Sequence, residues 1–366
     1  SINNADSWLK WTKDFPTVPV KDLVIQEREN DLVIGTFGRS AWVIDNINPL
    51  RELADNYSLL ENKIELFEPS TSVLASYQQP TGSRFGGDAL YNGENRRSGA
   101  LISYYFNREK SNDTLNKKLK DSLFLNIYDG ERLIRTLKKK SPKESGFYKW
   151  TWRMDEKGKQ RPSRKIRKNK FESSGVTVKP GNYKIELTFN DEKSYSSINV
   201  INDPRTDANQ NIDQQYNSLK EIDDLLQKSA DIVRQLVESK NIANGLKSRL
   251  SKLDKDKFKD EINLSSKMVK QSDSLVALFL GKIDKRQGIT RNKESNVQEK
   301  IYKAYYYISS RPNGNTITES NLIKHANNSL NNAVKLVNAF FIDKWKSYKE
   351  QMDKLEYSEF KDVKQF

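Results

Sequence analysis

The sequence predicts a multidomain protein in which β-structure precedes α-helix: strands of a β-propeller blade, then an immunoglobulin-like antiparallel β-sandwich, then an antiparallel α-helical bundle. Three observations predict this order. Short apolar runs separated by turn residues fill residues 20–202. From residue 210 onwards, apolar residues recur at spacings of three and four, as on one face of a helix. The chain has 366 residues, which is more than one hydrophobic core usually organises.

Composition excludes several kinds of site. The chain has no cysteine, which excludes disulfides, thiolate metal ligands and a cysteine nucleophile. Its 63 Lys and Arg against 49 Asp and Glu give a formal charge of +14, spread along the chain apart from one local peak. No apolar run approaches the roughly 20 residues that span a bilayer, so no transmembrane segment is expected. The first residues hold neither an initiator methionine nor a leader, and we expect the chain to start inside a longer precursor.

Residues 20–46 contain three short apolar runs, DLVIQ, DLVIGTF and SAWVID. Turn residues separate them: residues 29–31 lie between the first two runs, and Gly38 with Arg39 between the second and the third. Runs of this length predict a small antiparallel sheet. Such a sheet is most of one propeller blade, which needs neighbours to cover its faces.

The run from Phe15 to Leu53 resembles the closing blade of bacterial, Bacteroidetes-type sortilin-like propeller proteins, whose sialidase-type repeats often bring them a glycosyl hydrolase label. In that family a Thr-His-Gly-Arg turn is followed by Trp-x-x-Asp. The structural motif stands here as Thr36, Phe37, Gly38, Arg39, Trp42 and Asp45. Phe37 replaces the family's histidine, so a polar role at that position is absent. A looser resemblance continues through RRSGALISYYF, PGNYKIEL and NDPRTD and covers most of the chain.

The resemblance implies that residues 1–65 are an incomplete closing blade and a linker. It implies that the chain is the non-catalytic C-terminal scaffold or interaction region of an extracytoplasmic protein, which is secreted, periplasmic or on the cell surface. The partner would be a protein or glycan ligand of the propeller, and no cofactor is expected. The alternative is part of a glycoside hydrolase whose catalytic carboxylates lie in blades outside this chain.

Residues 66–202 contain six further strand-like runs: SGALISYYF, LFLNIYDG, RLIRTLK, FYKWTWRM, GNYKIELTF and SYSSINVI. Asp129-Gly130 follows the second run and indicates a hairpin, because glycine tolerates the positive φ that the turn needs. Within GNYKIELTF, alternate residues are apolar and share one face: Tyr183, Ile185, Leu187 and Phe189. Strands at this spacing predict an antiparallel sandwich of immunoglobulin-like type.

The boundary to the helical region, residues 203–366, falls at Asp203-Pro204-Arg205. Proline cannot occupy a central strand, so Pro204 ends the last one. We interpret these three residues as a hinge in which Asp203 caps the next segment and Arg205 pairs locally.

Four amphipathic stretches follow, near residues 210–253, 256–284, 295–310 and 316–355. The last opens with Thr316 and Glu319 at capping-box spacing. Four such stretches predict an antiparallel bundle.

The local charge peak is residues 157–170, KGKQRPSRKIRKNK, in which eight of fourteen residues are Lys or Arg. Nucleic-acid proteins usually combine a basic surface with a recognisable motif or interleaved aromatic residues, and this stretch has neither, so no specific nucleic-acid partner is expected. Its place between two predicted strands indicates a solvated loop at a sandwich edge. The alternative is a nonspecific polyanion contact through Arg161, Arg164, Lys165, Arg167 and Lys168.

No catalytic, cofactor-binding or metal site is expected within the chain. The acidic residues fall mainly in predicted turns or on solvent faces of predicted helices. The only histidine, His325, lies in a predicted helix with no motif around it, which favours a structural role over catalysis. The glycines of GTFGRS lack the spacing of a phosphate-binding loop and lead into a strand.

Overall fold

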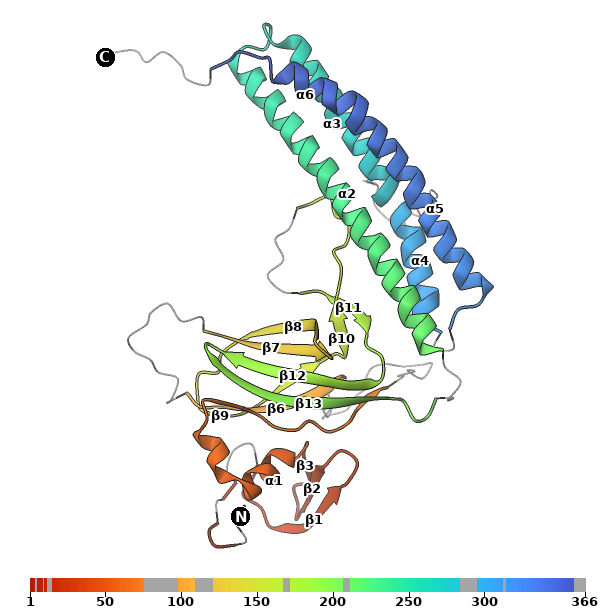
Figure 1. Ribbon diagram of the computed structural model, residues 1–366. Helices are drawn as coiled ribbons and strands as arrows, with labels where there is room; N and C mark the ends of the chain where they lie inside the picture. Colours follow the sequence, from red (N-terminus) through yellow and green to blue (C-terminus); the bar gives the residue numbers. More distant parts are fainter. Residues whose placement is uncertain are drawn as a thin grey trace, which may run out of the picture. The chain divides into compact units, whose positions relative to one another are not determined.

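The computed structural model describes residues 1–3, 5–8, 10–11, 15–75, 98–108, 121–166, 172–206, 211–283, 295–311 and 314–358. It is a mixed α/β structure with several antiparallel sheets, followed by helices (Figure 1). The chain divides into two compact units. We call Ser1–Lys157 with Thr177–Ala208 the β unit, and Gly158–Val176 with Asn209–Phe366 the helical unit.

The predicted N-terminal sheet is confirmed. Strands β1 (Val20–Gln26), β2 (Asp31–Thr36) and β3 (Ala41–Ile44) pair antiparallel in the order β1-β2-β3. Asn30, with φ 55°, supplies the left-handed residue of the first turn. After β3 come helix α1 (Asn48–Asp55) and a 3-10 turn, η1 (Tyr57–Glu61).

Two further sheets belong to the β unit. One has the order β5-β13-β12-β7-β8, antiparallel except for the parallel pair β13 and β5, and the other has the order β4-β6-β9. Strands β12 and β13 curve along their length (Figure 1). The bounds are β4 Ile64–Leu66, β5 Ser72–Leu74, β6 Ala100–Phe106, β7 Ser122–Asp129, β8 Arg132–Lys140, β9 Gly146–Trp152, β12 Gly181–Phe189 and β13 Glu192–Asn202.

These two sheets share one hydrophobic core. The alternation predicted for β12 is confirmed, because Tyr183, Ile185, Leu187 and Phe189 are all buried in it. Facing sheet residues include Phe106 of β6, whose ring meets that of Phe189 edge to face at 5.1 Å. The predicted β7–β8 hairpin is also confirmed, with Gly130 at φ 58°.

The helical unit is built from long amphipathic helices around a second core. Helix α2 (Ile212–Leu253) runs for 42 residues, about 63 Å at 1.5 Å per residue, and Gly245 does not interrupt it. The others are α3 (Lys259–Leu280), α4 (Val297–Ser309) and α5 (Ile317–Ala339). Helix α5 continues without a break through a π-helical segment, η3 (Phe340–Trp345), into α6 (Lys346–Met352).

The helices form three rods, and the second runs antiparallel to the first and the third (Figure 1). The first rod is α2, the second is α3 followed by α4, and the third is α5-η3-α6. Near the start of α2, the Gln215 amide donates to the Ile308 carbonyl at the end of α4, at 2.9 Å. Further along, Lys240 Nζ donates to Asp273 of α3 at 2.7 Å. The hydroxyls of Ser265 in α3 and Tyr348 in α6 are 2.9 Å apart, which aligns the second rod with the third.

The chain passes between the units three times, and two of these crossings lie at short strands, β10 (Asp155–Lys157) and β11 (Ser174–Thr177). Among the described helices, none has the length and apolar character needed to cross a bilayer.

Candidate functional site

The described part of the basic stretch lies on the helices, not on a sandwich edge. We call residues 158–166 the basic strap. Lys159 Nζ lies 3.5 Å from Asp224 of α2. Gln160 is held on both sides, because its backbone N–H donates to Gln227 Oε1 at 2.9 Å and its side-chain oxygen accepts from Arg234. The strap is therefore anchored along successive turns of α2.

Two strap arginines reach the second rod. The Arg161 guanidinium lies over the ring of Tyr302 in α4, 5.7 Å from the ring centroid, a cation–π geometry. Arg164 donates to the carbonyl of Gly281, just past the end of α3. These contacts differ from the expected free loop, because both arginine head groups lie against the helices, although Arg161 stays exposed to solvent.

A buried carboxyl lies near the strap. Asp223 of α2 is only 7% exposed. Burial raises the pKa of Asp223, and the nearby cations Lys220, Lys159 and Arg161 act in the opposite direction. The strap therefore brings positive charge to a carboxyl that the helix packing has removed from water.

The five residues expected to contact a polyanion fall into three groups: those that contact the helices, one that is exposed, and those outside the described residues. Arg161 and Arg164 are engaged with the helices. Lys165 is exposed, and its backbone N–H donates to the Ser163 hydroxyl at 3.2 Å. Arg167 and Lys168 lie outside the described residues.

The residues expected to form a blade motif span the turn between β2 and β3: Thr36 ends β2, Trp42 lies in β3, and Asp45 follows β3. Gly38 has φ 80°, which suits glycine. The Thr36 hydroxyl donates to the Ser40 carbonyl at 2.5 Å, and the Trp42 indole N–H to the Arg39 carbonyl at 2.9 Å. Two side chains of the motif are thus hydrogen-bonded to backbone carbonyls within the same turn.

The end of the motif is tied to the sheet β4-β6-β9. The carbonyl of Asp45 accepts a 2.8 Å hydrogen bond from Lys149 Nζ in β9. Phe37, which stands where the family has histidine, is 70% exposed.

Asp203, Pro204 and Arg205 follow β13 directly. Asp203 is buried, and its carboxylate accepts from the Arg205 side chain at 2.8 and 2.6 Å and from the Arg205 backbone N–H at 3.0 Å. The Asp203 carbonyl accepts from the Thr206 backbone and hydroxyl. These bonds make the segment a tight local turn.

A groove lies between the second and third rods, and sequence reasoning did not identify it. Its first part has a volume of about 560 Å³. It is lined by two lysines of α4, Lys300 and Lys303. From α5 it is lined by the chain's single histidine, His325, and by three neutral polar residues, Asn328, Ser329 and Asn332. Leu278, Val297, Leu322, Ala333 and Leu336 form its apolar surface. Lys300 Nζ donates to the Ser329 hydroxyl at 3.3 Å across the groove.

The second part of the groove, about 590 Å³, lies between α3 and the end of the third rod. Leu336 belongs to both parts, so they adjoin. The charged residues of this part are Lys267, Lys270, Asp343 and Lys344. Its end is formed by the π-helical segment, a rare conformation that is frequent at functional sites. We call the two parts together the rod groove.

The third rod presents one continuous stripe to the rod groove, from Leu322 to Lys344. Members of this stripe recur at spacings of three or four, as on one side of a helix. The sequence does carry a signal for it: no Asp or Glu lies between Glu319 and Asp343, and six asparagines do.

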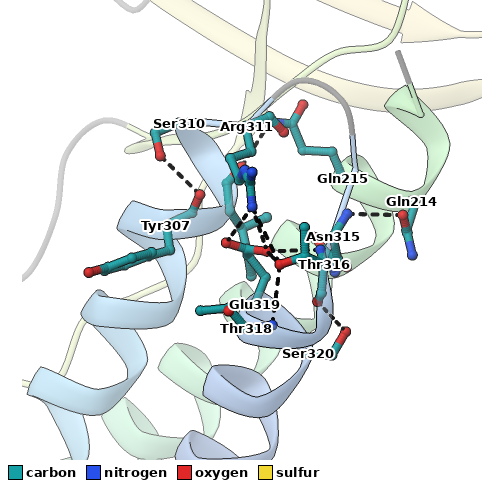
Figure 2. Close-up of polar contacts among 12 residues, drawn as sticks. Gln214, Gln215, Tyr307, Ser310, Arg311, Asn315, Thr316, Thr318, Glu319 and Ser320 are labelled. Carbon is teal, nitrogen blue, oxygen red and sulfur yellow. Dashed lines mark hydrogen bonds and ion pairs between the residues drawn. The ribbon is translucent and has the colours of Figure 1, made fainter. Parts of the chain in front are cut away.

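The turn between α4 and α5 closes one end of the helical unit. Figure 2 shows Arg311 and Thr316 directed at the buried carboxylate of Glu319. Glu319 accepts from the Thr316 backbone N–H at 2.8 Å, from the Thr316 hydroxyl, and from Arg311 Nη1 at 3.4 Å. This confirms the predicted capping box.

These bonds hold the pKa of Glu319 below its usual value, the Thr316 hydroxyl first and Arg311 as a lesser cause. Asn315 links the same turn to the start of α2, because its backbone N–H donates to Gln214 at 3.0 Å (Figure 2) and its side chain to Ser218 at 2.6 Å. This cluster of hydrogen bonds thus links the start of the third rod to the start of the first.

Within the described part of the chain, no group of three or more His, Cys, Asp or Glu residues is arranged to hold a metal ion. No protein-family model matches the chain, and no curated protein matches it closely enough to assign a family.

Proposed function

We propose that this chain is a non-catalytic scaffold and interaction region of an extracytoplasmic sortilin-like propeller protein. In this proposal the sheet β1-β2-β3 belongs to a blade and packs between neighbouring blade strands. We also infer that the sheets β5-β13-β12-β7-β8 and β4-β6-β9 form an immunoglobulin-like sandwich, for which their shared core is the support.

The observation that carries the proposal is that β1-β2-β3 is apolar on both faces. The register aligns Val24, Val33 and Val43 in one row across the sheet. The next row, on the opposite face, is Leu23, Ile34 and Trp42. A sheet that meets water on one face normally alternates apolar and polar residues, whereas a sheet covered on both faces does not.

Much of this apolar surface is open. Val24 and Val43 are 54% and 56% exposed on one face, and Leu23 is 58% exposed on the other. A three-stranded sheet with so much open apolar area is only marginally stable by itself, so covering it with further β-structure would stabilise it. Propeller blades are covered in this way by the blades on either side.

The test compares this chain with a longer product that includes whatever the gene encodes before Ser1. Hydrogen exchange is measured in Val20–Gln26 and Ala41–Ile44, with Ser122–Asp129 of the β-unit core as the matched control. The proposal predicts exchange at least about tenfold slower in β1 and β3 of the longer product, and unchanged exchange in β7.

Equal exchange in both products, or a gene without further blade-like strands, would contradict the blade assignment. Hydrolysis of a glycoside by the purified chain would contradict the non-catalytic role separately.

A further inference from the structure

We propose that the rod groove binds an acidic polysaccharide, a chain of sugars that carry uronate or sulfate groups. The inference does not rest on the propeller resemblance. Its first support is charge: among the described residues that line the groove, five are lysines, Lys267, Lys270, Lys300, Lys303 and Lys344, and one, Asp343, is a carboxylate. Such a lining attracts an extended anion.

The groove is long enough to follow a polymer. Its stripe on the third rod runs from Leu322 to Lys344, about 30 Å at the helical rise. The facing wall is α3 followed by α4, which lie in line along the second rod. The lysines are distributed along this length, with Lys303 in the first part and Lys267 in the second, so several charges of one chain can be neutralised together.

The neutral lining favours sugars. Hydroxyl and amide side chains occur in both parts of the groove, among them Ser266, Ser274, Ser329, Asn263, Asn328 and Asn332. Amides and hydroxyls both donate and accept hydrogen bonds, as sugar hydroxyls require. Leu278 and Leu336 are 38% and 55% exposed in the middle, where they offer apolar surface to the C–H faces of a sugar ring.

Two other anionic polymers fit the lining less well. Single-stranded nucleic acid is usually held by exposed aromatic rings on which the bases stack, together with arginine. Among the lining residues that the structure describes, Phe340 is the only aromatic one and is buried, and none is arginine. An amphipathic acidic helix would need a continuous apolar stripe, and Asn328, Ser329 and Asn332 interrupt it.

The test measures fluorescence anisotropy of a labelled heparin oligosaccharide with the full chain. The groove variant is Lys270→Gln, Lys300→Gln and Lys303→Gln together. The control variant, Lys228→Gln, Lys252→Gln and Lys324→Gln, has the same net charge, and its sites are exposed helix positions outside the groove lining. One exposed ion pair is worth up to roughly a fivefold change in affinity. We therefore expect the affinity of the groove variant to fall by about tenfold or more, and the affinity of the control variant to change by less than about twofold.

A third variant separates sugar recognition from charge alone. Asn332→Leu keeps every lysine but removes an amide from the lining, and weaker binding is expected. Circular dichroism verifies that each variant keeps its helices. Competition with polygalacturonate and with dextran sulfate distinguishes uronate from sulfate recognition, and neutral dextran should not compete.

Several results would overturn the proposal: no binding by the unaltered chain, equal loss in the groove and control variants, or unchanged binding by Asn332→Leu. Tighter binding of a single-stranded oligonucleotide or of polyglutamate than of the sulfated sugar would do so as well. So would loss of binding only on replacing Lys165, Arg167 and Lys168, because that result would assign the anion to the basic stretch.

Discussion

Removing the carboxylate of Glu319 tests whether the α4–α5 turn stabilises the helical unit. Glu319→Ala deprives the Thr316 backbone N–H and hydroxyl of their acceptor and leaves Arg311 without this partner. Loss of a helix cap costs about 1 kcal/mol. The ion pair adds up to about 1 kcal/mol and not the cost of a fully buried pair, because Arg311 is 50% exposed and water can solvate it. We therefore expect the free energy of unfolding to fall by about 2 kcal/mol.

The assay is urea unfolding at neutral pH, followed by far-ultraviolet circular dichroism, which reports mainly on the helices. Glu350→Ala, at an exposed position of α6, is the matched control and should change stability by less than about 0.5 kcal/mol. A loss below that limit for Glu319→Ala would refute the reasoning.

A second substitution at this site, Glu319→Gln, makes a pH test. The pKa of Glu319 is lowered in the folded state, so its contribution is present above the unfolded-state pKa and is lost as pH falls through the folded-state value. The difference between Glu319→Gln and the unaltered chain should therefore shrink once the pH falls below about 4.3, the usual value for glutamate. A difference that stays constant down to the acid limit of folding would contradict this assignment.

Two further substitutions test the packing of each unit. Gly99→Ala places a Cβ against the Trp152 carbonyl oxygen at a φ of +118°, and we expect thermal unfolding of the β unit to show a loss of more than about 2 kcal/mol; a neutral result would contradict the close approach. Arg161→Ala removes the contact with Tyr302 and should cost about 0.5–1 kcal/mol in urea unfolding of the helical unit, whereas Arg161→Lys should restore part of it.

Local signals predicted much of the secondary structure. Gly130 and the alternation of β12 indicated a hairpin and a buried face, and both are present. Thr316 with Glu319 marked the start of α5 because a capping box is encoded within four residues. The equivalent box of α4, Asn296 with Glu299, follows the same rule and was not identified.

Features that depend on tertiary partners were not accessible in the same way. The position of the basic strap depends on contacts with Tyr302 and Asp224, which are distant in sequence. The lysines and arginines of the strap by themselves predict only a solvent-exposed segment. The π-helical segment has no known local sequence pattern that predicts it, because it arises where packing inserts a residue into a helix. The rod groove could not be predicted from the sequence, because it depends on α3 and α4 lying in line as one rod. Its lack of negative charge does have a sequence signal, the stretch without Asp or Glu after Glu319.

The route of the chain limits how the protein can be cut. Covalent connections join the two units at residues 157–158, 176–177 and 208–209. A fragment that starts at residue 209 lacks Val176, which is buried in the core of the helical unit, and loses the anchors of Gln160 on α2. A protease that cleaves once between residues 158 and 176 yields two pieces that each carry part of both units. Such a nicked protein should migrate as one particle in native conditions and as two bands after denaturation.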